Sequence, residues 1–226
     1  MRADTAANSS TPPLRHRRPA RGSEEFVRVL GFSDGLFAIA MTLLVVSVSV
    51  PVLKDGNSVD ELIHALNDRS AEIVSFFISF VVIGRYWVAH HRFFALIGAF
   101  DYGLIAVNLV YLAFIAFLPF PTALLGNYFD NPLSVIVYAV NIAIVSSLEV
   151  LLFRQAFRSG LFEREMPPAV YRYAISASSL PVAFMVLSVP IAFVGSWLAV
   201  LCWFAAAPVQ GLWLDRRRPA EVGDWF

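Results

Sequence analysis

The stretch from Val29 to Val52, which reads VLGFSDGLFAIAMTLLVVSVSVPV, decides the fold class of this chain. It is apolar almost throughout, with Asp34 as its one charged residue, and the polar run from Lys54 to Asn57 follows it. About 20 consecutive apolar residues are needed for a helix to cross the ~30 Å hydrocarbon core of a bilayer. The stretch therefore predicts a membrane-spanning helix.

Five more stretches of similar length and composition follow along the chain. They cover approximately residues 70–89, 100–120, 132–153, 168–189 and 191–214. Each is expected to be a helix, because no water is present in lipid to satisfy the backbone polar groups of other structures. The whole chain is 58% hydrophobic and only 15% charged, whereas soluble domains are about one quarter charged. The sequence thus predicts an all-α membrane protein with six transmembrane helices.

The distribution of basic residues predicts the orientation in the membrane. Of the 17 lysines and arginines, only Lys54 and Arg69 fall in loops on the side opposite the N-terminus. Because loops rich in Lys and Arg stay on the cytoplasmic side, both termini are expected to be cytoplasmic. We expect a disordered basic arm at 1–25, a six-helix domain at 26–214 and a short cytoplasmic tail at 215–226. The arm would contact anionic lipid headgroups.

Two polar residues, Ser33 and Asp34, stand near the cytoplasmic end of the first predicted helix. A carboxylate inside a membrane segment costs a few kcal/mol at the centre and less near an end, so such residues usually face protein or a wet path. This favours a first helix that is surrounded by other helices. The alternative is that Arg28 and Asp34 merely anchor the helix end near the headgroups, and physical reasoning alone leaves both open.

The same helix carries an aliphatic stripe. At about 100° per residue, Ile39, Leu43 and Val46 fall within roughly 60° of one another, and Thr42 lies at the edge of their stripe. Asp34 lies about 140° away from Ile39 on the same helical wheel. If the polar side packs on helices of the same subunit, the stripe faces either lipid or a symmetry axis.

The pattern Arg28-x-x-x-Phe32-Ser33-Asp34 resembles the signature of the transmembrane protein 175 family of potassium channels. Two other stretches, 84–92 and 108–120, fit the same family, and the continuation after Asp34 looks like its bacterial members. The resemblance implies a homotetramer with six helices per subunit, in which the first helix of each subunit lines a central pore. It also implies a multi-pass protein of the bacterial inner membrane.

The resemblance further implies which residues line the pore. The narrowest ring of the family comes from the residue five positions after the motif Asp, which is Ile39 here. The next rings correspond to Leu43 and Val46, with Thr42 as a polar contributor between them. Ile39 and Val46 are β-branched where Leu is frequent, which would change the diameter of the constriction.

The motif residues are expected to hold the first helix by hydrogen bonds behind the pore. As a hypothesis, Trp87, His90 and Asn108 are the partners of Ser33 and Asp34. The full expected network consists of Arg28, Phe32, Ser33, Asp34, Trp87, His90 and Asn108.

These expectations predict a leak-type, potassium-selective cation channel. An aliphatic ring offers a passing ion no ligands in place of its water. Potassium holds its water less tightly than sodium, so dehydration in the ring costs potassium less free energy. Such constrictions also gate by dewetting. The chain has no Thr-Val-Gly-Tyr-Gly loop for selection by carbonyl groups. Cation preference is attributed to Asp55, Asp60 and Glu61 in the outer loop, which would enrich cations locally. Potassium ions, lipid and further copies of the chain are the expected partners.

Two other functions remain open for the same fold. A secondary transporter needs a midplane site, commonly built from broken helices in paired repeats, and paired interruptions in the two halves are not evident. A proton channel, as animal relatives are argued to be, needs titratable groups along the pore, whereas the stripe is aliphatic. A membrane enzyme is not expected, because no convergent catalytic groups are recognised. No metal, cofactor or nucleic acid is expected to bind.

Overall fold

The computed structural model describes residues 19–225, apart from the side chain of Ala207. Most of the basic arm expected at the N-terminus, residues 1–18, lies outside this range. The elements in chain order are α1 (Glu24–Leu43), the 3₁₀ turn η1 (Leu44–Ser47), α2 (Val59–Asp68), α3 (Ser70–Ala95), α4 (Tyr102–Phe117), α5 (Pro119–Asn127), α6 (Pro132–Arg158), α7 (Pro168–Ala192), α8 (Ser196–Arg216) and η2 (Ala220–Asp224).

The prediction of an all-α membrane protein with six transmembrane helices is confirmed. Six helical segments of the described chain are long and apolar enough to cross a membrane. Two of them are composite, since α1 continues as η1, and α4 continues as α5 after a break at Leu118. The six segments are α1 with η1, α3, α4 with α5, α6, α7 and α8.

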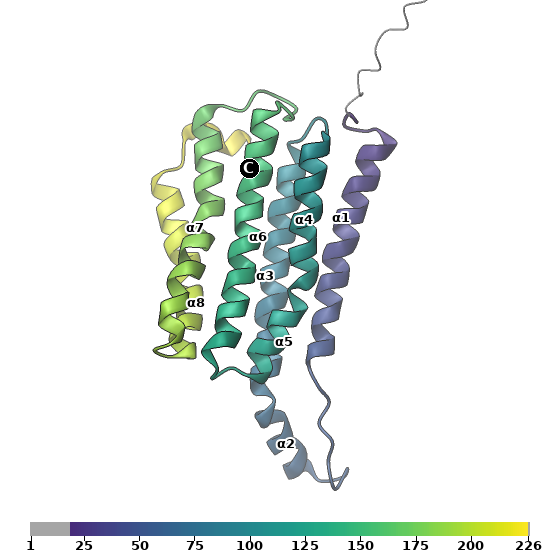
Figure 1. Ribbon diagram of the computed structural model, residues 1–226, viewed down its shortest axis with the longest axis vertical. Coiled ribbons are helices and arrows are strands. Elements are labelled where there is room, and N and C mark those ends of the chain that lie inside the picture. The colour runs from purple at the N-terminus through teal and green to yellow at the C-terminus, as the bar shows by residue number, and fades with distance from the viewer. Residues whose placement is uncertain (1–18, 226) are drawn as a thin grey trace, which may run out of the picture.

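The helices stand side by side in one bundle (Figure 1). Helix α1 packs on α3 and α4, α4 packs on α6, and α6 packs on α7, which in turn packs on α8. As a result α1 lies at one edge of the bundle and α7 with α8 at the other (Figure 1). Both ends of the described chain lie at the same end of the bundle, and α2 projects from the opposite end. An even number of membrane crossings produces this arrangement.

Two helix boundaries differ from the sequence-based expectation. The first helix was expected to reach Val52, but α1 ends at Leu43 and the chain is already extended at Val48. The backbone N–H of Ser49 is captured by the carboxylate of Glu72 at 2.9 Å, which no local pattern indicates. The last helix was expected to begin at Ile191, but this residue belongs to α7, because its carbonyl accepts the hydrogen bonds that close the following turn.

Hydrogen bonds between buried side chains join the helices across the bundle. Tyr86 Oη and Ser146 Oγ lie 2.6 Å apart and connect α3 with α6. Thr122 Oγ1 of α5 donates to Ser79 Oγ of α3 at 2.8 Å, and Tyr138 Oη lies 3.2 Å from the same oxygen. Such bonds contribute to helix association in membranes, where apolar side chains gain little by leaving lipid.

Helices α3 and α5 approach so closely that Gly126 has no room for a side chain. A Cβ atom at this position would lie 2.8 Å from Cα of Glu72. We expect Gly126→Ala to destabilise the fold by about 1–3 kcal/mol, the range for overpacking, in thermal unfolding of the purified protein in detergent. Gly211→Ala is the matched control, because nothing lies within 4 Å of the place that a Cβ atom would occupy there. Equal melting temperatures for the two variants would contradict the close crossing.

Both terminal segments of the described chain pack on the end of the bundle where they meet. Arg21 forms an ion pair with Glu163 and donates to the carbonyl oxygen of Ala95 at 2.8 Å. Its segment was expected to belong to a disordered arm reaching residue 25. In the tail, Val222 is buried against Met166 and Val170 at the start of α7. The segments flanking the bundle are thus partly ordered by contacts with its loops.

Candidate functional site

One face of α1 is held by the rest of the subunit. The residues of this face recur every three to four positions, which places them on one side of a helix. They pack toward α3, α4 and α5, the helices that α1 contacts. The buried residues are Phe26, Ser33, Phe37, Ala40 and, at the start of η1, Leu44.

The predicted aliphatic stripe lies on the surface of the subunit. Ile39 is 55% exposed, Leu43 45% and Val46 77%. Thr42 is exposed too, but its hydroxyl donates to the carbonyl oxygen of Ile39 at 2.8 Å, so the polar group is turned back to its own helix. Val46 belongs to η1 rather than α1, so the 100° spacing used for the wheel does not extend to it. The surface therefore presents alkyl groups without a protein partner inside the subunit.

Three buried polar side chains connect α1 with α3 and α4. Asn108 Nδ2 donates to Ser33 Oγ at 3.0 Å, and Asn108 Oδ1 lies 2.9 Å from His90 Nε2. Ser33 Oγ in turn donates to the carbonyl oxygen of Val29 at 2.9 Å. Since the amide oxygen of Asn108 only accepts, Nε2 of His90 carries the proton in this arrangement. The chain of bonds fixes α1 to the two helices behind it.

Asp34 has a separate partner at the edge of the same face. Trp87 Nε1 of α3 donates to Asp34 Oδ1 at 2.9 Å. The Trp87 ring lies 5.6 Å from the ring of His91, and its side chain is 39% exposed. Asp34 is therefore bound on the flank of α1, between the buried face and the surface, rather than inside the bundle.

The structure does not bring Arg28 and Phe32 into either set of hydrogen bonds. Arg28 pairs with Glu24 at 3.9 Å, and both side chains are at least 80% exposed, so the pair contributes little. Phe32 is 54% exposed and has no hydrogen-bonding group in its side chain. Arg28 is five residues from Ser33, which puts it about 140° away around the helix. Within one subunit these two motif residues face outward.

Sequence reasoning missed Glu72, which holds the first membrane segment at the end of the bundle opposite the ends of the described chain. Its carboxylate accepts the backbone N–H of Ser49 at 2.9 Å and a guanidinium N–H of Arg69 at 3.1 Å, and the side chain is only 10% exposed. The only local signal is an acidic residue in the first turn of a membrane helix, a position that is ordinarily explained by the helix dipole.

The acidic outer loop is ordered by Glu61 at the start of α2. Its carboxylate accepts the backbone N–H groups of Lys54 at 2.8 Å and of Asp55 at 3.1 Å. These two hydrogen bonds hold the pKa of Glu61 below its usual value. Within residues 19–225, no three His, Cys, Asp or Glu side chains are grouped so as to hold a metal ion.

Residues 28–119 match the family described as endosomal/lysosomal potassium channel TMEM175. "Potassium channel Cha6605_3372" of Chamaesiphon minutus is 30% identical over 184 residues, which cover 80% of this chain and 90% of the relative. "Potassium channel B446_29190" of Streptomyces collinus is 34% identical over 183 residues, covering 76% and 85%. The mouse "Endosomal/lysosomal proton channel TMEM175" is 27% identical over 154 residues, covering 68% of this chain and 30% of the relative.

Two solved structures share the fold. The crystal structure of a lysosomal potassium-selective channel TMEM175 homolog from Chamaesiphon minutus superposes with a TM-score of 0.68 at 28% identity, covering 87% of this chain and 100% of that one. The MtTMEM175 T38A variant, crystallised with a nanobody fusion, gives a TM-score of 0.62 at 20% identity, covering 88% and 96%. The second likeness bears on the fold alone.

Proposed function

This chain belongs to the TMEM175 family of ion channels, and from that premise we propose that it forms a potassium-selective, leak-type cation channel. The observation that carries the proposal is the division of α1 into a buried face and an exposed aliphatic face. Two bacterial relatives that align over most of their length are named potassium channels.

We propose a homotetramer in which α1 of each subunit faces a central axis. The exposed side of α1 includes Gly31 and Gly35, and nothing in the subunit lies within 4 Å of the place where their side chains would begin. Small residues allow membrane helices to approach closely. An aliphatic and small-residue surface on a helix at the edge of the bundle suits a contact among copies.

In this proposal Ile39, Leu43 and Val46 form successive rings around the axis, with Thr42 between them. Alkyl rings give an ion no ligands to replace its water, so the ion that loses water at the lower cost passes more readily. Such rings also close a pore by dewetting. Selection then depends on the diameter of the Ile39 ring, and no catalytic step is involved.

The hydrogen bonds behind α1 serve in this proposal to hold the rings at a fixed radius. Ser33, Asn108 and His90 fix the middle of the buried face, and Glu72 fixes the segment beyond η1. Sites of this kind need side chains whose positions are locked by the shell around them. The arm at 1–25 and the tail at 215–226 would be cytoplasmic extensions of the channel domain at 26–214, in a bacterial inner membrane.

The experiment that tests the proposal combines subunit counting with flux. Native mass spectrometry of the purified protein should give four 25.0 kDa chains, and liposomes containing it should release potassium without a coupled ion or saturation. A smaller assembly would contradict the central pore. Saturating flux that requires a second ion would indicate a transporter.

Proton conduction is the second candidate, because the mouse relative is named a proton channel. Proton flux is measured in the same liposomes with a pH gradient and a pH-sensitive dye, in the absence of permeant metal cations. Proton flux exceeding potassium flux under equal driving force would replace the first proposal.

The acidic outer loop is expected to set the preference for cations over anions. In the triple variant Asp55→Asn, Asp60→Asn, Glu61→Gln, cation-over-anion permeability should fall, because fixed charge no longer enriches cations at the pore mouth. The effect should shrink at high salt, since the screening length is only about 10 Å at 0.1 M. Reversal potentials in a potassium chloride gradient measure it. Unchanged reversal potentials would contradict the role of the loop.

A matched triple variant, Asp215→Asn, Glu221→Gln, Asp224→Asn, removes as many acidic groups at the other end of the bundle and should have a smaller effect.

The lowered pKa of Glu61 adds a pH dependence. The hydrogen bonds that lower this pKa stabilise the loop above the usual Glu range and are lost as the pH falls through the lowered value. Outer acidification into the usual Glu range should therefore neutralise Glu61 less than an ordinary glutamate.

A further inference from the structure

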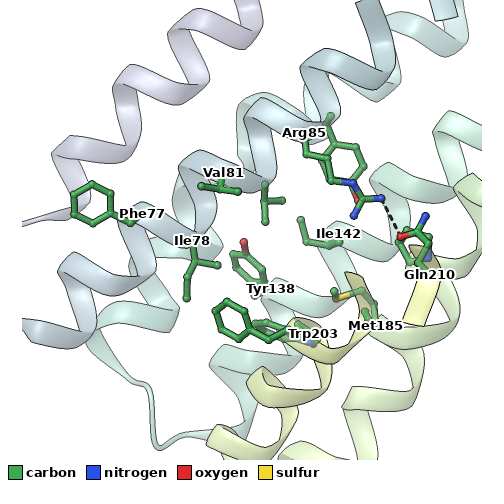
Figure 2. A pocket seen from close by; sticks show the side chains of 14 residues that line it. Phe77, Ile78, Val81, Arg85, Tyr138, Ile142, Met185, Trp203 and Gln210 are labelled. Atoms are coloured by element: carbon green, nitrogen blue, oxygen red, sulfur yellow. Dashed lines mark hydrogen bonds between the residues drawn. The ribbon is translucent and has the colours of Figure 1, made fainter. Parts of the chain in front are cut away.

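A cavity of about 420 Å³ lies among α3, α6, α7 and α8, in the half of the subunit away from α1. Figure 2 shows side chains from these helices around it, with Ile78 and Val81 of α3, Ile142 of α6 and Met185 of α7 among the apolar ones. Its volume falls in the range of roughly 300–1,000 Å³ that small-molecule sites occupy. Phe77 and Val81 at its rim are 62% and 69% exposed, so the cavity opens toward the outside of the bundle.

One end of the cavity carries a cation. Arg85 Nη2 of α3 donates to Gln210 Oε1 of α8 at 3.4 Å (Figure 2), which is longer than the usual range of about 2.7–3.2 Å. No carboxylate of a described residue lies within 4.0 Å of the Arg85 guanidinium. Glu149 of α6 interacts with Arg85 through its charge, but it hydrogen-bonds to Ser178 and does not line the cavity.

The wall of the cavity also holds a buried donor that has no partner. Trp203 Nε1 is buried and has no acceptor among the described residues. The Trp203 ring stacks on Tyr138 with 5.1 Å between ring centroids, while Tyr138 Oη already contacts Ser79. Burying a polar group without a hydrogen bond costs free energy. The cavity is therefore apolar, with one unsatisfied donor in Trp203 and a guanidinium that makes one long hydrogen bond, so a ligand that fits it supplies acceptor oxygens and an apolar body.

We propose that this cavity binds a single-chain carboxylate of the fatty-acid class. The alkyl chain fills the apolar wall, and the carboxylate accepts hydrogen bonds from Arg85, with which it forms a charge-assisted pair. Arg85 lies ten residues before the end of α3 at Ala95, which is about 15 Å along a helix. The headgroup of a two-chain phospholipid stays at the membrane surface, so a site at this depth favours a single-chain ligand in this proposal. The binding site is independent of the proposed pore.

The test uses 9,10-dibromostearate, whose bromine atoms quench tryptophan fluorescence on contact. The full-length protein in phosphatidylcholine nanodiscs is titrated with it, and the same titration of Trp203→Phe is subtracted to isolate the signal of Trp203. The Trp203 component should saturate, and Arg85→Gln should weaken the apparent affinity at least about tenfold, since charge-assisted bonds are among the strongest available. Arg85→Lys should retain part of the affinity. The methyl ester of the probe should bind the wild type as weakly as the acid binds Arg85→Gln.

Three results would overturn the proposal. Equal affinity of the wild type and Arg85→Gln, or of the acid and its methyl ester, would mean simple partitioning into an apolar groove. Stronger Arg85-dependent quenching by a brominated phosphatidylglycerol would assign the cavity to a membrane phospholipid. Ala206→Phe, which fills the cavity from α8 and leaves Arg85 in place, should also abolish saturable quenching. This second variant keeps the test decisive if Arg85→Gln fails to fold.

Discussion

Replacing Ile39 with asparagine is expected to abolish the preference for potassium over sodium and to increase total cation flux. In the proposed tetramer the substitution places four amide groups where four alkyl groups had formed the narrowest ring. Amide oxygens can replace water around either ion, so the difference in dehydration cost that separates potassium from sodium disappears. Reversal potentials measured with potassium on one side and sodium on the other give the permeability ratio directly.

The control for this prediction is Leu187→Asn. Leu187 of α7 is 56% exposed, close to the 55% of Ile39, and lies at the other edge of the bundle. It should leave the permeability ratio unchanged, because α7 is not proposed to line the pore. If Ile39→Asn forms tetramers and keeps the selectivity of the wild type, Ile39 does not line the constriction.

Replacing Asn108 with leucine is expected to lower the free energy of unfolding by about 2 kcal/mol or more. The substitution leaves Ser33 Oγ without a donor and His90 Nε2 without an acceptor, in positions where both residues are at most 3% exposed. Each buried polar group that loses its partner costs about 1–3 kcal/mol. Unfolding of the detergent-solubilised protein by heat or denaturant measures the change.

A double-mutant cycle with Ser33→Ala separates the bond from general effects of the substitution. The two changes should be coupled by about 0.5–2 kcal/mol, the range for hydrogen bonds between membrane helices. Asn127→Leu is the matched control, because this exposed residue only donates to the Ala123 carbonyl of its own helix. Additive effects of Ser33→Ala and Asn108→Leu would show that the bond contributes nothing.

The helical architecture could be predicted from the sequence because it depends on length and composition. An apolar run long enough to cross lipid satisfies its backbone groups as a helix when it lacks the alternating pattern of barrel strands. Helical periodicity also placed Asp34 about 140° away from Ile39, off the aliphatic stripe. The structure buries Ser33 but leaves Asp34 on the flank, because adjacent residues differ by about 100° around a helix.

The features that could not be predicted depend on contacts distant in sequence. The early end of α1 involves Glu72, and the bond from Glu72 to Ser49 spans an entire outer loop. Helix α2 is only ten residues long, too short to produce a membrane signal, and the 3₁₀ turn that carries Val46 has no marker in its sequence. Arg28 and Phe32 were grouped with the hydrogen-bonding residues because they share a motif, although their helical positions point elsewhere.

The most direct test of a potassium-selective pore is the reversal potential of the purified wild-type protein in a planar bilayer, with potassium chloride on one side and an equal concentration of sodium chloride on the other. We expect a steady cation current whose reversal potential is displaced from zero toward the equilibrium potential of potassium. The reversal potential should change sign when the two solutions are exchanged. A reversal potential near zero in both arrangements, from protein that is folded and tetrameric, would contradict a potassium-selective pore.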